Sequence, residues 1–213
     1  MKKLYSKLFV AGVTFSLVRT LIHRLFVLKD IRKKIFTGYK TKIIKHHSAE
    51  IKISGNVYID ARNDGHFYYY SSIRLKERSL LSFKGEVNFF SGLSLKLFEN
   101  AYVEIGNGTY FSGPITLHSK EKIIIGENCS ISWGCTIIDS NFHKIDYDTD
   151  IVTKEVNIGD RVWIGNGVII LPGTVIESDV IVGAGSVVKG HLLANGIYAG
   201  NPAKLIRYRK GSE

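Results

Sequence analysis

Large aliphatic residues recur at every sixth position between Ile158 and Val188, and a smaller residue follows each of the first five at an interval of four. Neither the 3.6-residue period of a helix nor the alternation of an ordinary strand produces this double pattern. A unit of one short strand and one turn does, with the large residue filling the middle of a face and the small residue fitting beside a corner. Three such faces close a triangular coil, and coils stack at the strand spacing of about 4.8 Å. The pattern therefore predicts a parallel β-helix. The large positions are Ile158, Ile164, Ile170, Ile176, Val182 and Val188, and the small positions are Val162, Val168, Thr174, Val180 and Ser186.

The same pattern continues in degraded form toward the N-terminus, from about Ile51. A series of β-hairpins is the alternative, but hairpins would not impose two classes of position, and the two-residue turn pairs that they need are missing. The stretch from Ile105 to Ile125 is two residues longer than one coil, which predicts a bulge between Leu117 and Ile123. The aromatic tract from His66 to Tyr70 is expected to cap the coil or to stack on a sugar ring.

Two cysteines, Cys129 and Cys135, stand six apart in successive small-residue positions. We expect both to be small buried hydrophobic residues. Because no Cys-x-x-Cys pair or histidine partner accompanies them, neither a disulfide framework nor a metal site is expected. This use of cysteine is compatible with a reducing compartment.

The repeat breaks off after Ile138 and resumes out of phase at Val156. Repeat proteins place insertions in loops on one face, which is often the functional face. This loop holds a histidine among carboxylates and amides, whereas the surrounding coil is apolar and chemically inert. Histidine is well suited to take up and release a proton near neutral pH. The polar residues of interest are Asp139, Asn141, His143, Asp146 and Asp148.

The N-terminal region, from Leu4 to Phe36, has roughly helical spacing of apolar residues with Lys and Arg between them. The net charge of +10 is concentrated here, since residues 1–47 contain twelve Lys and Arg against one Asp and the remainder sums to −1. The longest uncharged run, Leu8 to Val18, is shorter than the ~20 residues of a membrane span, and no clear signal-peptide cleavage site follows it. Two interpretations stay open: a helical arm packed on the domain or a neighbouring subunit, and an amphipathic helix within residues 1–36 on an anionic membrane surface. No nucleic-acid partner is expected, because no binding motif for one is present.

These patterns predict an all-β fold in three parts. The chain ends with a turn at Asn201-Pro202 and a short basic tail from Leu205 to Lys210. The parts are a basic helical N-terminal arm (1–47), a β-helix domain (48–190) with a candidate catalytic loop (139–157), and a C-terminal segment (191–213).

Four stretches stand out: Ile158-Gly-Asp-Arg-Val-Trp163-Ile-Gly165-Asn166, Ile170-Leu-Pro-Gly173, Val182-Gly-Ala-Gly-Ser-Val-Val188 and Ala199-Gly-Asn-Pro-Ala-Lys-Leu-Ile-Arg207. Together they resemble the hexapeptide-repeat acyltransferases, and most closely the maltose and galactoside O-acetyltransferases and the polysaccharide O-acetyltransferases. The similarity is strong over residues 125–210, begins at the level of repeats near residue 51, and does not cover the arm. The resemblance implies a left-handed coil, although spacing alone does not determine the hand. It also implies a three-fold symmetric homotrimer with active sites between neighbouring coils, acetyl-CoA as cosubstrate, no metal, and a CoA-binding role for residues 191–213.

The resemblance further implies roles for the loop residues. His143 matches the family's loop histidine and is expected to act as a general base, deprotonating an acceptor hydroxyl as it attacks a thioester carbonyl. A carboxylate would fix the tautomer of this histidine, and Asp139, Asp146 and Asp148 all stay candidates. Asn141 is expected to hold the acceptor or to orient the loop.

The coil itself is expected to bind both substrates. Trp163 matches a family tryptophan that lines the acyl and acceptor cleft, and with Asp146 it is assigned to substrate binding. A backbone amide between Trp163 and Asn166 is expected to stabilise the thioester oxyanion. The family usually has Thr in place of Lys189 and Arg in place of Lys204; the second change keeps the charge but loses the bidentate fork. The pantetheine arm is expected along a glycine-rich wall and the phosphates on basic residues, with the cofactor-binding set being Gly165, Asn166, Gly183, Ala184, Lys189, Lys204 and Arg207.

We therefore expect an acetyl-CoA-dependent O-acetyltransferase that modifies a hydroxyl of a saccharide, such as a surface polysaccharide or its precursor. Its expected location is cytoplasmic, and a peripheral position on the inner face of the membrane stays open with the role of the arm. His118 is a second, weaker candidate for the base. The main alternative function is that of an amino-sugar N-acetyltransferase or a xenobiotic acetyltransferase of the same fold. A zinc enzyme of this architecture would need three converging imidazoles, whereas His118, His143 and His191 are scattered along the chain. A non-catalytic module that anchors a polysaccharide assembly would bind no acetyl-CoA.

Overall fold

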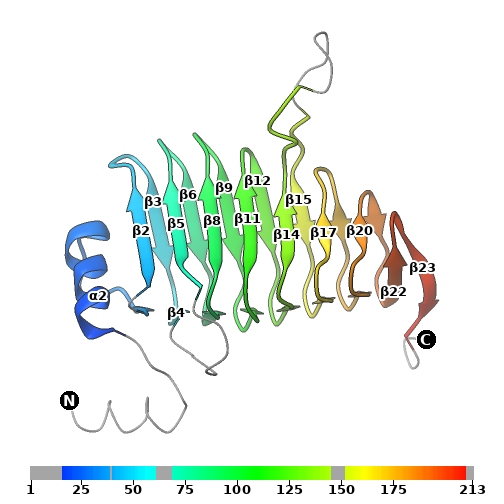
Figure 1. Ribbon diagram of the computed structural model, residues 1–213, viewed down its shortest axis with the longest axis horizontal. Helices are drawn as coiled ribbons and strands as arrows, with labels where there is room; N and C mark the ends of the chain where they lie inside the picture. The colour runs from blue at the N-terminus through cyan, green and yellow to red at the C-terminus, as the bar shows by residue number, and fades with distance from the viewer. Residues whose placement is uncertain (1–15, 39, 61–68, 145–151, 210–213) are drawn as a thin grey trace, which may run out of the picture.

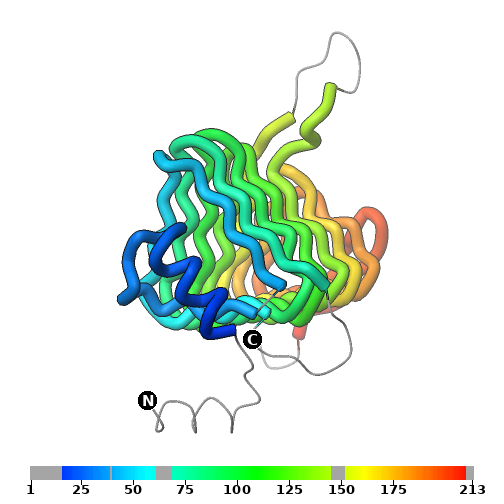
Figure 2. The backbone as a smooth tube through the Cα atoms, turned by 60° about the vertical axis from the view of Figure 1, so that its left-hand side comes forward, coloured from blue at the N-terminus to red at the C-terminus, as the bar shows by residue number. Residues whose placement is uncertain are grey.

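The computed structural model describes residues 16–38, 40–60, 69–144 and 152–209. They form a triangular prism of stacked coils, with three sheets as its walls (Figures 1 and 2). Within a coil the chain passes through the first, second and third sheets in turn, and each strand pairs in parallel with the strand one coil away. The predicted left-handed parallel β-helix is confirmed.

The first sheet contains β1 (Ile35–Thr37), β4 (Val57–Ile59), β7 (Val87–Phe89), β10 (Tyr110–Phe111), β13 (Ser130–Ile131), β16 (Trp163–Ile164), β19 (Ile181–Val182), β22 (Gly196–Gly200) and β23 (Ala203–Tyr208). The second sheet contains β2 (Thr41–Lys45), β5 (Ser71–Leu75), β8 (Leu93–Leu97), β11 (Ile115–Ser119), β14 (Cys135–Ile138), β17 (Ile169–Ile170) and β20 (Val187–Val188). The third sheet contains β3 (Glu50–Ile53), β6 (Leu80–Phe83), β9 (Tyr102–Ile105), β12 (Lys122–Ile125), β15 (Val156–Ile158), β18 (Val175–Ile176) and β21 (His191–Leu192).

The core is the column of side chains that the hexapeptide pattern points inward. Every predicted large and small position between 158 and 188 is buried, and Cys129 and Cys135 are buried free thiols. Burying one large aliphatic side chain stabilises the fold by roughly 1.5–3 kcal/mol. Toward the N-terminus the wider coils are filled by aromatic rings, and Phe89 stacks on Phe111 with ring centroids 4.5 Å apart.

The prism narrows toward the C-terminus. In the second sheet, β11 has five residues, β14 four and β17 two. The bulge expected between Leu117 and Ile123 is therefore wrong. The extra residues lengthen a regular strand instead, in which His118 pairs with Lys96 and Ser119 with Leu97.

The coil begins earlier than expected, at Ile35 rather than after residue 47, because β1 and β2 pair with β4 and β5. The helical region correspondingly ends earlier, at Val27. Within the described residues it consists of α2 (Leu17–Ile22), with Ser16 as N-cap, and the π-helix η1 (His23–Val27). Positions before 16 lie outside the described residues. No helix in the described chain has the length and apolar character needed to cross a membrane.

This helical segment covers the N-terminal end of the prism (Figure 1). The Ser16 N–H donates to the Thr37 carbonyl at 3.0 Å, and His23 Nδ1 lies 3.0 Å from the Thr37 hydroxyl. Burial, with a smaller contribution from Arg19, lowers the His23 pKa to about 4. Terminal repeats of a solenoid need such a cap to shield the open end of the core. The expectation of an arm packed on the domain therefore holds for this segment.

The C-terminal segment continues the prism rather than leaving it after residue 190. β21 pairs in parallel with β18. After the turn that contains the cis Asn201–Pro202 bond, β23 folds back antiparallel on β22. The expected basic tail is thus largely a strand at the edge of the first sheet.

Candidate active site

The predicted catalytic loop is a flap that rises between β14 and β15, at the second corner, where the second and third sheets meet (Figure 1). Its two arms are joined by an antiparallel bridge between Ser140 and Thr153. Asp146 and Asp148 lie outside the described residues, so their expected roles stay predictions.

Asp139 anchors the flap on the preceding coil. Its carboxylate is buried and accepts three hydrogen bonds, from the Ser119 hydroxyl at 2.6 Å, the Lys120 N–H at 2.7 Å and the Glu121 N–H at 2.9 Å. Both carboxylate oxygens are therefore engaged by this turn. Asp139 is a structural anchor, and the expectation that it orients His143 finds no support in these contacts.

Asn141 and Phe142 continue the described arm. The Asn141 N–H donates to the Val152 carbonyl at 3.1 Å, while both polar atoms of its side-chain amide are buried and have no hydrogen-bond partner among the described residues. Phe142 has a positive φ of 60°, unusual for a bulky residue. Its ring packs against Phe98, with centroids 5.1 Å apart. His143 follows directly and is exposed.

A second group lies at the first corner, between the first and second sheets. The Gly165 N–H donates to the Val182 carbonyl and the Gly183 N–H to the Tyr198 carbonyl, each at 2.8 Å. A Cβ on Gly165 would lie 2.6 Å from the Ala184 nitrogen, so only glycine fits this wall. The predicted cofactor residues of this corner are thereby stacked in two successive coils, and they are Gly165, Asn166, Gly183 and Ala184. We call these four residues the glycine wall.

Two exposed tryptophans flank this wall. Trp163 is 54% exposed on the outer face of the first sheet. Trp133, which the sequence analysis did not single out, is 57% exposed, and its carbonyl accepts a hydrogen bond at 2.8 Å from the Asn166 amide. Ile131 pairs with Ile164, so Trp133 stands at the same corner position as Asn166, each two residues after its strand partner. This correspondence within the repeat is the sequence signal by which Trp133 could have been found.

The basic candidates are divided between the corners. Lys204 on β23 pairs with Ala199. A Cβ built on Gly183 would lie 3.0 Å from the Ala199 Cβ. Lys204 therefore lies beside the glycine wall. Arg207 lies farther along β23 and donates to the Tyr208 carbonyl. Lys189 follows β20 at the second corner. The structure therefore does not bring Lys189 to the wall.

The hydrogen bonds of the coil limit which backbone N–H group could stabilise the oxyanion. The Trp163 N–H donates to the Val180 carbonyl at 2.9 Å, and the Gly165 N–H is also used in the ladder. Neither is available to a ligand. Among the N–H groups of Trp163, Gly165 and Asn166, that of Asn166 donates to no backbone carbonyl within the described chain.

His118, the second candidate base, projects from β11 on the second sheet. Its Nε2 lies 3.1 Å from the Ser94 hydroxyl. Burial, and then the charge of Lys96, lower the His118 pKa. The His118 ring is therefore held beside a neighbouring hydroxyl and its neutral form is favoured, whereas His143 is exposed.

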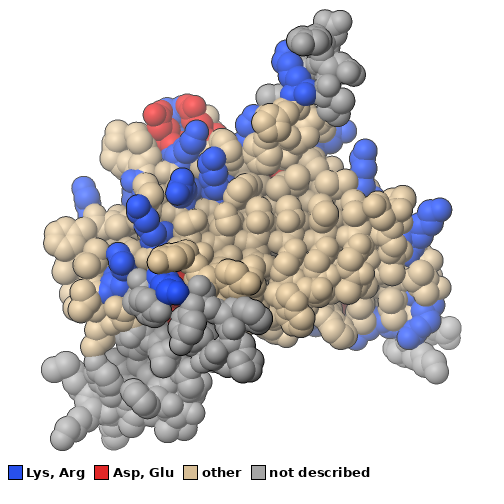
Figure 3. All heavy atoms as spheres, viewed as in Figure 1, with Lys and Arg blue, Asp and Glu red and all other residues tan. Residues whose placement is uncertain are grey.

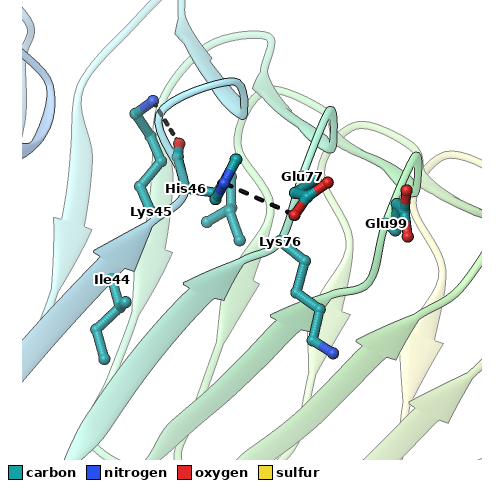
Figure 4. Close-up of a pocket in the computed structure, with 7 residues that line it drawn as sticks. Ile44, Lys45, His46, Lys76, Glu77 and Glu99 are labelled. Carbon is teal, nitrogen blue, oxygen red and sulfur yellow. Dashed lines mark hydrogen bonds and ion pairs between the residues drawn. The ribbon is translucent and has the colours of Figure 1, made fainter.

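The two groups of site residues are not joined within one chain. The flap leaves the second corner and the glycine wall forms the first corner, with the second sheet between them. An open hollow of about 570 Å³ lies at the second corner of the N-terminal coils, lined by residues that include His46, Lys76 and Glu77 (Figure 4). A further hollow of about 430 Å³ lies between η1 and β2. Neither hollow contains the predicted catalytic residues.

Comparisons with known proteins agree with this architecture. The family described as "Bacterial transferase hexapeptide (six repeats)" matches residues 155–190. WbbJ of Escherichia coli K12, named as a candidate lipopolysaccharide biosynthesis O-acetyl transferase, is 34% identical over 134 residues, covering 56% of this chain and 68% of WbbJ. The galactoside O-acetyltransferase of the same organism is 30% identical over 124 residues, covering 51% of this chain and 61% of that protein. The crystal structure of the polySia-specific acetyltransferase NeuO has a TM-score of 0.51 at 19% identity, over 82% of this chain and 91% of NeuO, a likeness of fold.

The matched repeat lies in the parallel coils of the prism, and this chain covers 68% of WbbJ at 34% identity. The chain is a member of the hexapeptide-repeat acetyltransferases.

Proposed function

We propose that this protein transfers the acetyl group of acetyl-CoA to a hydroxyl of a saccharide, with His143 as general base. The observation that carries the proposal is the flap. Its foot is fixed by Asp139 and by the packing of Phe142 on Phe98, and it presents His143 directly beyond these anchors, exposed. The named O-acetyltransferases among the relatives support the reaction class, although this chain spans only about two thirds of the length of each.

The proposed chemistry follows from these groups. His143 takes the proton of the acceptor hydroxyl while the oxygen attacks the thioester carbonyl. The tetrahedral intermediate then collapses, the carbon–sulfur bond breaks, and the proton passes from the imidazolium to the leaving thiolate. A base placed in this way contributes roughly 10²–10⁴-fold to the rate. The Asn166 N–H is the proposed oxyanion donor.

Asn141 is proposed to hold the acceptor. Leaving its buried amide unpaired costs about 1–3 kcal/mol. A small movement of the flap that lets this amide bind an acceptor hydroxyl would remove that cost. The orphan amide therefore favours a flap that completes its hydrogen bonds only with substrate present.

The separation of flap and wall within one chain supports an assembly in which neighbouring copies share a site. We propose a homotrimer, in which the flap of one protomer lies over the glycine wall and Trp163 of its neighbour. Three-fold closure uses the same pair of surfaces three times and leaves none unpaired. The pantetheine arm would lie along Gly165 and Gly183, with Lys204 near the phosphates.

The N-terminal segment is proposed to rest on an anionic membrane surface. Val18 is 69% and Phe26 75% exposed, although both belong to the segment that caps the prism. Arg19 directly follows Val18. Exposed apolar side chains beside cations are typical of helices that lie in the plane of a bilayer. This placement, on the cytoplasmic face, suits an acceptor made at the membrane.

The test of the reaction is His143→Ala assayed at saturating acetyl-CoA. We expect kcat to fall by about 10²–10⁴-fold, and His47→Ala, which removes an exposed histidine outside the flap, to leave it unchanged. The acceptor panel includes neutral and acidic oligosaccharides, nucleotide sugars and amino sugars, so that O- and N-acetylation are told apart by the product. Near-normal turnover by His143→Ala would refute the proposed base.

A further inference from the structure

Cations occupy matching positions on the outer face of the second sheet. Arg74 on β5 pairs with Lys96 on β8, and Lys96 pairs with His118 on β11. Paired residues of neighbouring strands lie about 4.8 Å apart. The five-residue strands of these coils make the face wide enough to carry this row beside the flap.

Three lysines meet at the foot of the flap around a pair of aromatic rings. The amines of Lys76 and Lys96 lie 5.0 and 4.3 Å from the centre of the Phe98 ring, and that of Lys120 lies 5.8 Å from the centre of the Phe142 ring. The two rings pack on each other. We call these five residues the lysine–phenylalanine cluster. Because Phe142 immediately precedes His143, the cluster adjoins the candidate base.

These lysines lack the carboxylate partners that other lysines of the prism have. None of the three forms an ion pair within the described chain. On the third sheet, by contrast, Lys52 and Lys84 each lie within ion-pair distance of a glutamate. Figure 4 shows Lys76 directed away from the neighbouring Glu77 and Glu99. Figure 3 shows Lys and Arg spread over the N-terminal half of the second-sheet face, with acidic residues gathered at its upper edge.

The three ammonium groups lie around the same pair of rings, and an anion placed among them would be attracted by all three. Aromatic rings stabilise ammonium groups at such distances but do not neutralise them. The cluster is therefore complementary to a carboxylate or a phosphate, which ammonium groups bind through charge-assisted hydrogen bonds.

We propose that the lysine–phenylalanine cluster binds an anionic group of the acceptor saccharide and thereby places a neighbouring hydroxyl beside His143. This inference rests on the proposed function and adds to it that the acceptor is an acidic saccharide. We assign the cluster to the acceptor rather than to CoA because Phe142 joins it directly to His143, the proposed base for the acceptor hydroxyl.

The test compares two double variants of equal charge change. Lys96→Gln with Lys120→Gln removes two cations of the cluster, and Lys52→Gln with Lys84→Gln removes two paired cations of the third sheet. For a carboxylate-bearing oligosaccharide, we expect the KM of the first variant to rise about tenfold or more and that of the second to stay near wild type. The KM for acetyl-CoA and the transfer to a neutral oligosaccharide of equal length should not change in either. Lys96→Arg with Lys120→Arg keeps the charge and should restore most of the affinity.

Calorimetry without acetyl-CoA tests the cluster independently of catalysis. A uronic-acid oligosaccharide, a nucleoside-diphosphate sugar and a neutral oligosaccharide are titrated into wild-type protein and both double variants. If the variant without Lys96 and Lys120 binds only the uronic-acid oligosaccharide more weakly, the cluster is a carboxylate site. If it binds only the nucleoside-diphosphate sugar more weakly, the cluster is a phosphate site. Either result supports the inference. Unchanged binding of all three, or a rise in the KM for acetyl-CoA alone, overturns it. If the wild type acetylates no saccharide, the proposed function fails, and the titration still decides whether the cluster binds an anionic saccharide.

Discussion

Neighbouring residues of the flap have different tasks because their surroundings differ. Asp139 is buried against the turn of the preceding coil, where three donors converge on it. Phe142 is held against Phe98. His143, one position later, is exposed and is the residue that a substrate can reach. By residue type alone, Asp139 could have been either an anchor or a partner of His143. Its contacts with the preceding coil make it an anchor.

The residue-scale prediction concerns Asp139→Asn. The amide keeps one acceptor oxygen but places an NH₂ group against donors, so at least one buried hydrogen bond is lost. We expect the free energy of unfolding to fall by about 1–3 kcal/mol and kcat to fall with it, because the flap loses its anchor. Chemical denaturation and steady-state kinetics measure the two effects. Asp179→Asn, which breaks a surface pair with Arg161, should cost under about 1 kcal/mol. Equal effects of the two substitutions would contradict the anchoring role.

Within the described residues, the arms of the flap and the N-terminal helical segment depart from the regular repeat, and both lie where the prism meets its surroundings. The flap interrupts the coils at the second corner, and the segment from α2 to η1 closes the N-terminal end (Figure 1). The regular coils bury their apolar side chains inside and offer few reactive groups outside. The irregular elements therefore carry the proposed contacts with substrate and membrane.

The element-scale prediction concerns the N-terminal segment. Val18→Ser with Phe26→Ser removes two exposed apolar side chains without disturbing the Thr37 contacts that hold the cap. We expect weaker sedimentation with vesicles that contain anionic lipid, and an unchanged midpoint of unfolding. Ile169→Ser with Val175→Ser, which alters two partly exposed aliphatic residues of the C-terminal coils, is the matched control. Wild-type binding to neither kind of vesicle would argue against a membrane contact, and equal binding to both would argue against the proposed preference for anionic lipid.

At the scale of the whole molecule, the candidate site is divided between two corners of one rigid prism. Side chains cannot cross the second sheet, and the close packing of the coils prevents the corners from approaching each other. Within the described residues the flap and the glycine wall therefore lie at different corners. This separation is the basis of the proposed homotrimer, in which two copies of the chain would share each site.

The whole-molecule prediction is complementation between two inactive variants. His143→Ala removes the base, and Ala184→Trp fills the wall at an exposed position that tolerates a large side chain. Each variant should be inactive alone. Co-expressed and co-purified through different tags, they should regain part of the wild-type kcat, because some interfaces then pair an intact flap with an intact wall. Absence of recovery in assemblies shown to contain both variants would mean that each chain works alone.

The sequence by itself determined the repeat, the inward positions, the family and the presence of one histidine in the inserted loop. These features are local, because the spacing of residues within a hexapeptide decides which side chains face the core. Only the tertiary structure decided that the coils begin at Ile35, that Asp139 anchors the flap, and that Trp133 lies beside Asn166. It also decided that three lysines gather around Phe98 and Phe142. These features depend on which residues of successive coils lie above one another at a corner. The lengths of the strands and insertions between the corners set this alignment, and the repeat alone does not.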